Sequence, residues 1–214
     1  MSKLEEMIKK LCPNGVKTIQ LRYLVDFTNG KGHEKVVEEN GQYILITSKA
    51  ISTNMEQVRR TNAILTPLHK NDITMVMSDL PNGRALAKCF IVDADNTYTL
   101  NQRVCGLTIK DESKIIPKYL YYVLNRNKQL LKYDNGVDQT NLKKDDILDI
   151  GISVPPMEVQ CEIVHILDDF TLLSAELSAE LKARQMQYEY YRDKLLSFDK
   201  VSETLDTLQE RILL

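Results

Sequence analysis

Short apolar runs bounded by Gly, Pro, Asn and Asp recur through the first 150 residues. Runs of this length with such boundaries predict β-strands. The strand candidates are 42–47, 73–77, 87–92 and 104–109, and turns are expected at 29–30, 40–41 and 81–83. Helices are expected at roughly 2–11 and at 117–132, where Pro117 suits a first helical turn. This part of the chain is therefore predicted to be a mixed α and β domain.

The pattern changes near residue 151. Gly151 to Pro156 forms an extended segment closed by two prolines, which cannot belong to a helix interior. From Met157 to about Asp199 the chain has neither Gly nor Pro, so one long helix of about 64 Å is expected. We therefore predict an α+β chain with two parts, a domain over 1–152 and a long helix with a C-terminal extension over 153–214.

The predicted helix carries a heptad pattern. Two series of residues, each seven apart and offset by four, occupy the a and d positions: Ile163, Phe170, Leu177, Arg184, Tyr191 and Phe198, then Leu167, Ser174, Leu181, Tyr188 and Leu195. Such a seam packs either on the chain's own domain or on another helix. A rod of about 64 Å is longer than a compact domain of this size is wide, which favours a coiled-coil homodimer. Arg184 and Ser174 interrupt the seam, where they fix its register or contact a further subunit.

Composition indicates an ordinary globular protein. It is 43% hydrophobic and 27% charged. Residues 1–150 hold 22 Lys and Arg against 18 Asp and Glu, net +4, whereas 151–214 hold 6 against 12, net −6. A mildly basic first part is compatible with nucleic-acid binding. A charged N-terminus and the lack of a long apolar run favour a cytoplasmic protein without membrane segments.

Motifs for catalysis are missing from the sequence. Val154-Pro155-Pro156-Met157 superficially resembles an amino-methyltransferase loop, but valine cannot accept a hydrogen bond from a target amine. The segment 29–34 has neither the spacing of a phosphate-binding loop nor that of a metal site. Histidines and cysteines are scattered, so no metal is expected. The sequence predicts a binding protein that is not an enzyme and has no cofactor.

A family resemblance rests on the junction between the two parts. It is carried by Gly136-Val137-Asp138-Gln139-Thr140-Asn141-Leu142 and by Ile150-Gly151-Ile152-Ser153-Val154-Pro155-Pro156-Met157-Glu158-Val159-Gln160-Cys161-Glu162-Ile163-Val164. This stretch resembles the end of a target recognition domain in specificity subunits of type I restriction-modification systems. The segments 3–16, 100–104 and 188–196 also resemble those subunits.

The resemblance implies sequence-specific recognition of double-stranded DNA. In this family the specificity subunit supplies no chemistry, while modification subunits methylate adenine and restriction subunits cleave DNA. A full-length subunit has two target recognition domains and two long helices, and this chain has one of each. Half-length chains of this kind are expected to pair through antiparallel helices, which would give a symmetric, bipartite DNA site.

Candidate DNA contacts are cationic, amide or hydroxyl side chains in or beside predicted turns, because such groups read base edges and bind phosphates. They are Asn29, Lys31, Lys35, Lys49, Arg59, Arg60, Ser78, Asn82, Arg84, Gln102, Arg103, Gln139, Thr140, Asn141, Lys143 and Lys144. The alternative is a protein-interaction module in which the coiled coil is the functional element and no DNA is bound. Such a module would show no salt-sensitive DNA affinity.

Overall fold

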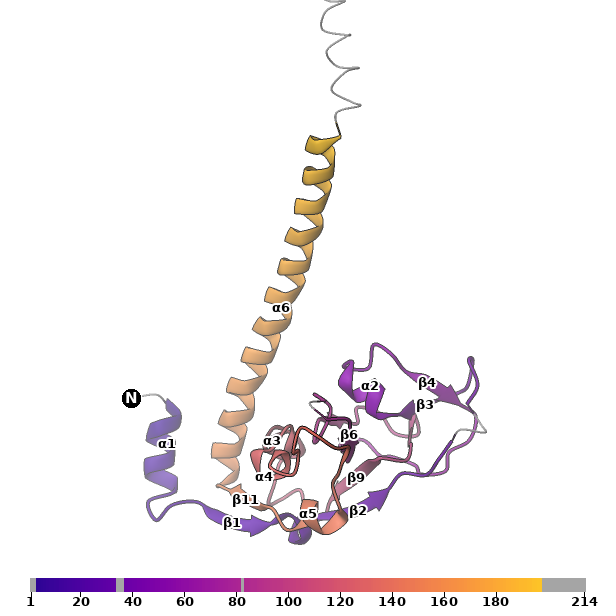
Figure 1. Ribbon diagram of the computed structural model, residues 1–214. Helices are drawn as coiled ribbons and strands as arrows, with labels where there is room; N and C mark the ends of the chain where they lie inside the picture. The colour runs from indigo at the N-terminus through magenta and orange to yellow at the C-terminus, as the bar shows by residue number, and fades with distance from the viewer. Residues whose placement is uncertain (1–2, 34–36, 82, 198–214) are drawn as a thin grey trace, which may run out of the picture. The chain divides into compact units, whose positions relative to one another are not determined.

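The computed structural model describes residues 3–33, 37–81 and 83–197. The chain divides into two compact units, Met1–His165 and Ile166–Leu214. The helix α6 (Met157–Leu196) crosses the boundary, so its first turns belong to the first unit (Figure 1). The functional division that the sequence predicts at residue 152 stays a prediction.

A four-stranded antiparallel sheet forms the centre of the first unit. Its strands, in spatial order, are β2 (Val25–Asn29), β9 (Val104–Ile109), β5 (Ile73–Val76) and β7 (Cys89–Ile91). Every residue of β5 is buried, as expected for a strand paired on both sides. The larger hydrophobic cluster combines this sheet with α3 (Pro117–Leu124), α4 (Lys128–Leu131) and α5 (Lys144–Leu148).

A second, three-stranded sheet has the order β4 (Arg59–Thr61), β3 (Tyr43–Ile46) and β8 (Tyr98–Leu100). The pair β3 and β4 is antiparallel, whereas β3 and β8 run parallel. A smaller hydrophobic cluster lies beneath this sheet and includes Tyr98. Burial, together with the hydrogen bond that the Tyr98 hydroxyl donates to Asp93, raises the pKa of Tyr98 to about 12.

Two short ladders complete the unit. The strand β1 (Lys17–Gln20) pairs antiparallel with β11 (Gly151–Val154), and β6 (Ser78–Asp79) pairs antiparallel with β10 (Thr140–Asn141). The remaining described elements are α1 (Lys3–Leu11), the 3-10 helix η1 (Leu21–Tyr23) and α2 (Ser48–Ser52). Figure 1 shows β11 beside β1 and leading directly into α6.

The four expected strands are present as β3, β5, β7 and β9, and the expected N-terminal helix is α1. The prediction of one helix over 117–132 was wrong, because α3 and α4 are separate. Arg126 between them has a positive φ of 57°, its backbone N–H donates to the Ala87 carbonyl, and Asn125 accepts a hydrogen bond from the backbone N–H of Cys89. These contacts with Cys89 of β7 and with Ala87 just before it hold residues 125 and 126 out of the helical conformation.

The long helix is confirmed over Met157–Leu196, 40 residues, or about 60 Å. Its first turns pack through Val159, Ile163 and Val164 against the larger hydrophobic cluster. Beyond them the described side chains of α6 are mostly exposed, large hydrophobic ones included. Among the residues that the structure describes, no helix is long and apolar enough to cross a membrane.

Candidate nucleic-acid interface

The parallel pairing of β3 and β8 creates the main candidate site. Ile46 lies opposite Leu100, so the two strands end side by side and their next residues, Thr47 and Asn101, are neighbours. The backbone N–H of Asn101 donates to the Ile46 carbonyl over 3.1 Å. Carboxyl ends of adjacent parallel strands form a natural crevice, because both chains leave the sheet at the same edge.

Three chain segments supply the polar side chains at this edge. Thr47 caps α2, since its Oγ1 accepts a hydrogen bond from the backbone N–H of Ala50 over 3.0 Å, and the cap fixes the positions of Ser48 and Lys49 at the start of the helix. On the other side of β3, the antiparallel strand β4 places Arg59 opposite Leu45.

The third segment is the turn 101–103 between β8 and β9. Arg103 adopts a positive φ of 69°, which is uncommon for a residue with a side chain. Its carbonyl accepts a hydrogen bond from the backbone N–H of Met77 over 2.9 Å, and this bond ties the turn to β5 and β6. The turn therefore holds Gln102 and Arg103 in one fixed place beside β3.

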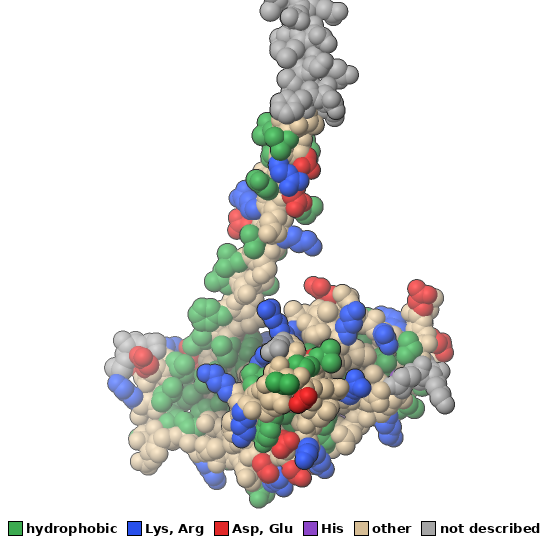
Figure 2. Space-filling model, in the orientation of Figure 1, with side chains coloured by type: hydrophobic (Ala, Val, Ile, Leu, Met, Phe, Trp, Pro, Cys, Tyr) green, Lys and Arg blue, Asp and Glu red, His purple; other side chains and the backbone are tan. Residues whose placement is uncertain are grey.

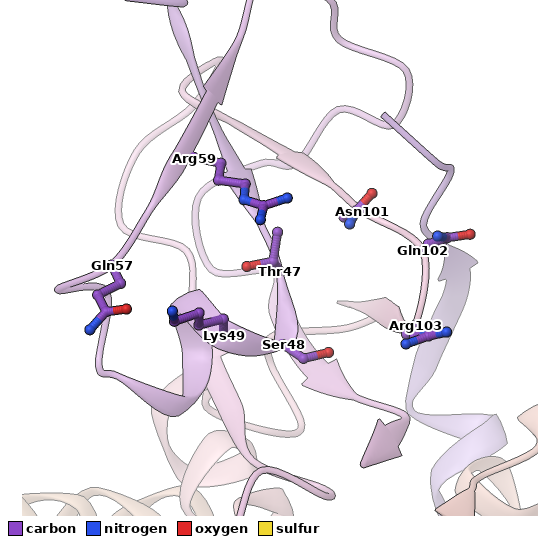
Figure 3. A pocket seen from close by; sticks show the side chains of 8 residues that line it. All are labelled: Thr47, Ser48, Lys49, Gln57, Arg59, Asn101, Gln102 and Arg103. Carbon is purple, nitrogen blue, oxygen red and sulfur yellow. The ribbon is translucent and has the colours of Figure 1, made fainter. Parts of the chain in front are cut away.

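Together these segments line a polar cleft of about 280 Å³, formed by Thr47, Ser48, Lys49, Gln57, Arg59, Asn101, Gln102 and Arg103. Figure 3 shows Thr47 directly after β3, Lys49 on α2 and Arg59 on β4, with Asn101, Gln102 and Arg103 on the facing segment. No acidic residue is among those that line the cleft. Within the described part of the chain, the side chains of Lys49, Arg59 and Arg103 form no ion pair or hydrogen bond. The cleft therefore presents three unneutralised cations.

A second, smaller hollow of about 150 Å³ adjoins the cleft and shares Ser48 and Arg103 with it. Its other lining residues are Ser78, Asp79, Leu80 and Gln139. Gln139 donates from Nε2 to the Ser78 Oγ over 2.7 Å, so the amide is held in a defined orientation.

The structure thus brings together six of the sequence-predicted DNA contacts: Lys49, Arg59, Gln102, Arg103, Ser78 and Gln139. Lys31 lies beside this group, because its backbone pairs with Asn101 in an isolated parallel bridge. Ser78 and the nearby candidate Thr140 are buried, which limits what they can offer a ligand.

Other candidates have different surroundings. Arg60 donates to the Gly41 carbonyl, Lys143 is the N-cap residue that precedes α5, and the Lys144 ammonium lies 5.4 Å from the centre of the Phe27 ring. Asn29, Arg84 and Asn141 are exposed or nearly so. Lys35, Asn82 and Phe198 lie outside the described residues.

Four residues of the cleft were not predicted from the sequence: Thr47, Ser48, Gln57 and Asn101. A signal existed for two of them, because a threonine followed by a helical segment suggests an N-cap and Asn101 directly precedes two predicted contacts. Among the described residues, no cluster of His, Cys, Asp and Glu could hold a metal ion.

The second unit offers a different kind of surface. Phe170, Leu173, Ser174, Leu177, Ser178 and Leu181 line an open groove of about 330 Å³ along α6. The predicted seam residues Leu177, Leu181 and Tyr188 are 58%, 61% and 67% exposed. The space-filling view shows hydrophobic side chains recurring along this helix (Figure 2). Ile163, by contrast, is already packed against the chain's own core.

Comparison with known proteins gives consistent results. A family model described as the type I restriction modification DNA specificity domain matches residues 13–184. The chain is 40% identical over 108 residues to the specificity subunit of the type I restriction enzyme EcoR124I/EcoR124II of Escherichia coli, covering 49% of this chain and 27% of that protein. It is 25% identical over 214 residues to a putative type I specificity subunit of Mycoplasma pneumoniae, covering 95% of this chain and 66% of the other.

Solved structures share the fold. The S subunit of a type I restriction-modification system from M. genitalium superposes with a TM-score of 0.59 at 19% identity, covering 92% of this chain and 51% of that one. The HsdS subunit from Thermoanaerobacter tengcongensis superposes with a TM-score of 0.59 at 15% identity, covering 83% and 44%. The chain therefore spans about half the length of these structures and about a quarter of the E. coli relative.

Proposed function

Because this chain belongs to the family of type I restriction modification DNA specificity domains, we propose that its first unit reads the base sequence of double-stranded DNA. The observation that carries the proposal is the cleft with three unneutralised cations, Lys49, Arg59 and Arg103, and no acidic lining residue. Cations without an internal partner can bind phosphate oxygens without first breaking an ion pair. Amide groups among them supply the donors and acceptors that distinguish bases.

We assign a role to each side chain of the cleft from its chemistry and from the element that carries it. Lys49 and Arg59 stand on separate elements and bind phosphates, which positions the duplex without reading it. Gln102 and Arg103 lie on one rigid turn and read base edges, where arginine pairs with guanine and glutamine with adenine. Asn101 adds a further amide on the same turn. The other DNA contacts predicted from the sequence are proposed to bind phosphates or bases at the periphery of the site.

We propose further that the chain acts without catalysis of its own. In this role it directs the methyltransferase and restriction subunits of a type I complex to the site that it reads. The proposal is supported by the match to the family of type I restriction modification DNA specificity domains.

DNA binding is tested by fluorescence anisotropy of the full chain with a labelled duplex over a range of salt concentrations. Each phosphate contact contributes about 0.9 to the slope of log affinity against log salt, so Lys49→Ala and Arg59→Ala are each expected to lower the slope by about that amount. Arg192→Ala is the matched control, because Arg192 is on α6 and already pairs with Asp193. An affinity that does not respond to salt would refute the proposal and favour the protein-interaction module.

We also propose that two copies of the chain pair through α6. The support is the exposure of Leu177, Leu181 and Tyr188 at a and d positions of the heptad pattern, together with the open groove beside them. In an antiparallel pair, a two-fold axis relates identical DNA-reading units, so the expected target is a bipartite, symmetric sequence.

Pairing is tested by light scattering of the full chain. The wild type is expected to have twice the chain mass, and the triple substitution Leu177→Asp, Leu181→Asp and Tyr188→Asp the mass of one chain, because burying carboxylates in a helix seam is strongly unfavourable. The matched control replaces Leu172 and Met186 with Asp. Both are about as exposed, at 62% and 63%, but lie off the seam, so this variant stays dimeric. A monomeric wild type would refute the pairing.

A further inference from the structure

One apolar side chain stands out among the polar residues of the proposed DNA-reading site. Leu80 lines the smaller hollow beside Arg103 and Gln139, and it is 68% exposed. Of the described residues that line the cleft and the hollow, Leu80 is the only one with an aliphatic hydrocarbon side chain. Single exposed leucines are common on protein surfaces, so its position and rigidity decide whether it matters.

The position of Leu80 is fixed by its neighbour Asp79. The Asp79 carboxylate accepts three backbone hydrogen bonds, from Leu80 over 2.9 Å and from Ala85 and Leu86 over 2.7 and 3.1 Å. The turn is closed again by the backbone N–H of Gly83, which donates to the Leu80 carbonyl over 2.9 Å. Leu80 is therefore presented to solvent by a clamped turn.

Glycine is required at position 83 for this clamp. A Cβ atom at Gly83 would clash with the Asp79 carboxylate, and moving that carboxylate would break its backbone hydrogen bonds. The hydrogen bonds of Asp79 thus hold Leu80 where its exposed apolar side chain lines the same hollow as Arg103.

The side chains around Leu80 complement the base edges that DNA presents in its major groove. In the major groove, guanine and adenine present hydrogen-bonding atoms that arginine and glutamine recognise, and the only apolar group is the 5-methyl of thymine. Arg103, Gln139 and Leu80 line one hollow of about 150 Å³ and offer these three complements together. The ladder of β6 with β10, in which Asp79 lies opposite Thr140, puts Leu80 next to Gln139 in register.

We infer that Leu80 is a specificity-determining residue that contacts the 5-methyl group of a thymine in the recognised sequence. The inference rests on the proposed function, because it places the major groove of DNA over the cleft and the hollow. Loss of the contact relaxes the preference at one base pair and leaves phosphate binding intact, since Leu80 carries no charge.

The test begins with selection of bound sequences from a randomised duplex library by the full chain. The wild type is expected to select a motif with a required A·T pair. Leu80→Ala is expected to accept other pairs at that one position, and Leu80→Met to keep the preference because the side chain stays apolar. Val137→Ala is the matched control, since Val137 is 75% exposed on the neighbouring loop but lines neither hollow.

The methyl contact itself is measured with a duplex in which the selected thymine is replaced by deoxyuridine. Uracil lacks the 5-methyl group, so wild-type affinity is expected to fall about four-fold, as for exposure of one buried methyl group. The affinity of Leu80→Ala is expected to be the same for both duplexes.

The outcomes separate the two proposals. A selected motif that Leu80→Ala leaves unchanged, or an equal loss with deoxyuridine for both proteins, refutes the thymine contact and leaves DNA recognition standing. A loss of affinity in Leu80→Ala for all sequences alike also refutes it, because the residue then acts without regard to sequence. If the wild type selects no motif, DNA recognition fails and the thymine contact fails with it.

Discussion

The glutamine at position 160 offers a direct test of how the first unit holds the start of α6. Gln160 is fully buried. Its Oε1 accepts a hydrogen bond from the backbone N–H of Ile116 over 2.9 Å, and its Nε2 donates to the carbonyls of Lys114 and Pro155 over 2.9 and 2.8 Å. One side chain thus joins the segment before α3, the end of β11 and the first turn of α6.

Replacing Gln160 with alanine removes all three bonds, and of the three partners the buried Pro155 carbonyl is left without this donor inside the unit. At about 1 kcal/mol of net stabilisation for each bond, the first unit should lose about 3 kcal/mol of unfolding free energy. The cavity left by the missing side-chain atoms acts in the same direction. In urea, with a slope of about 2 kcal/mol per molar, this corresponds to a midpoint lower by about 1.5 M.

The assay is urea unfolding of the full chain followed by circular dichroism and by tyrosine fluorescence, which is available because the chain has ten tyrosines and no tryptophan. Gln187→Ala is the matched control, since Gln187 lies on the same helix but is exposed and accepts one hydrogen bond, from Arg184. Its midpoint is expected to change by less than about 0.3 M. Equal shifts for the two variants would refute the structural role assigned to Gln160.

Three further predictions concern groups elsewhere in the first unit. Because the pKa of Tyr98 is about 12 in the folded chain and near 10 in the unfolded chain, its contribution to stability is complete below pH 10 and is lost between pH 10 and 12. In an ultraviolet difference titration, Tyr98→Phe should lack one tyrosine that ionises near pH 12 in the wild type. A titration curve that the substitution leaves unchanged would contradict this. Burial raises the pKa of the Cys105 thiol to about 12, so a thiol reagent should modify the exposed Cys161 in the folded chain and reach Cys105 only after unfolding. Equal rates of modification for Cys105 and Cys161 would show that this part of β9 is not buried. Asp79→Ala should lower stability by about 2–3 kcal/mol, because three backbone N–H groups lose their acceptor, and urea unfolding with no shift would disprove the clamp.

Local patterns in the sequence were sufficient for several elements. The strands β3, β5, β7 and β9 were predicted because short apolar runs ended at turn-forming residues. The start of α6 was predicted because two prolines precede a long stretch without Gly or Pro. In each case the information lies within a few neighbouring residues, so no tertiary contact was needed to read it.

Elements that depend on distant partners were not predictable in this way. The segment 117–132 has apolar residues at helical spacing, and nothing in that spacing reveals the break at Arg126. The break depends on hydrogen bonds with Ala87 and Cys89, which are about 40 residues away in the sequence. A helical pattern records only the local preference, and tertiary contacts override it here.

The candidate site shows the same division. The amino-acid sequence was enough to predict that cationic and amide residues lie in turns and that a heptad pattern follows them. Through the motif that ends at Val164, it also indicated which family the chain resembles. Which of the predicted contacts lie together depends on the three-dimensional fold. Lys49, Arg59 and Arg103 share a cleft because β3 pairs in parallel with β8, more than 50 residues further along the chain. Strand pairing of this kind is set by the packing of buried faces across the whole unit, and no local pattern encodes it.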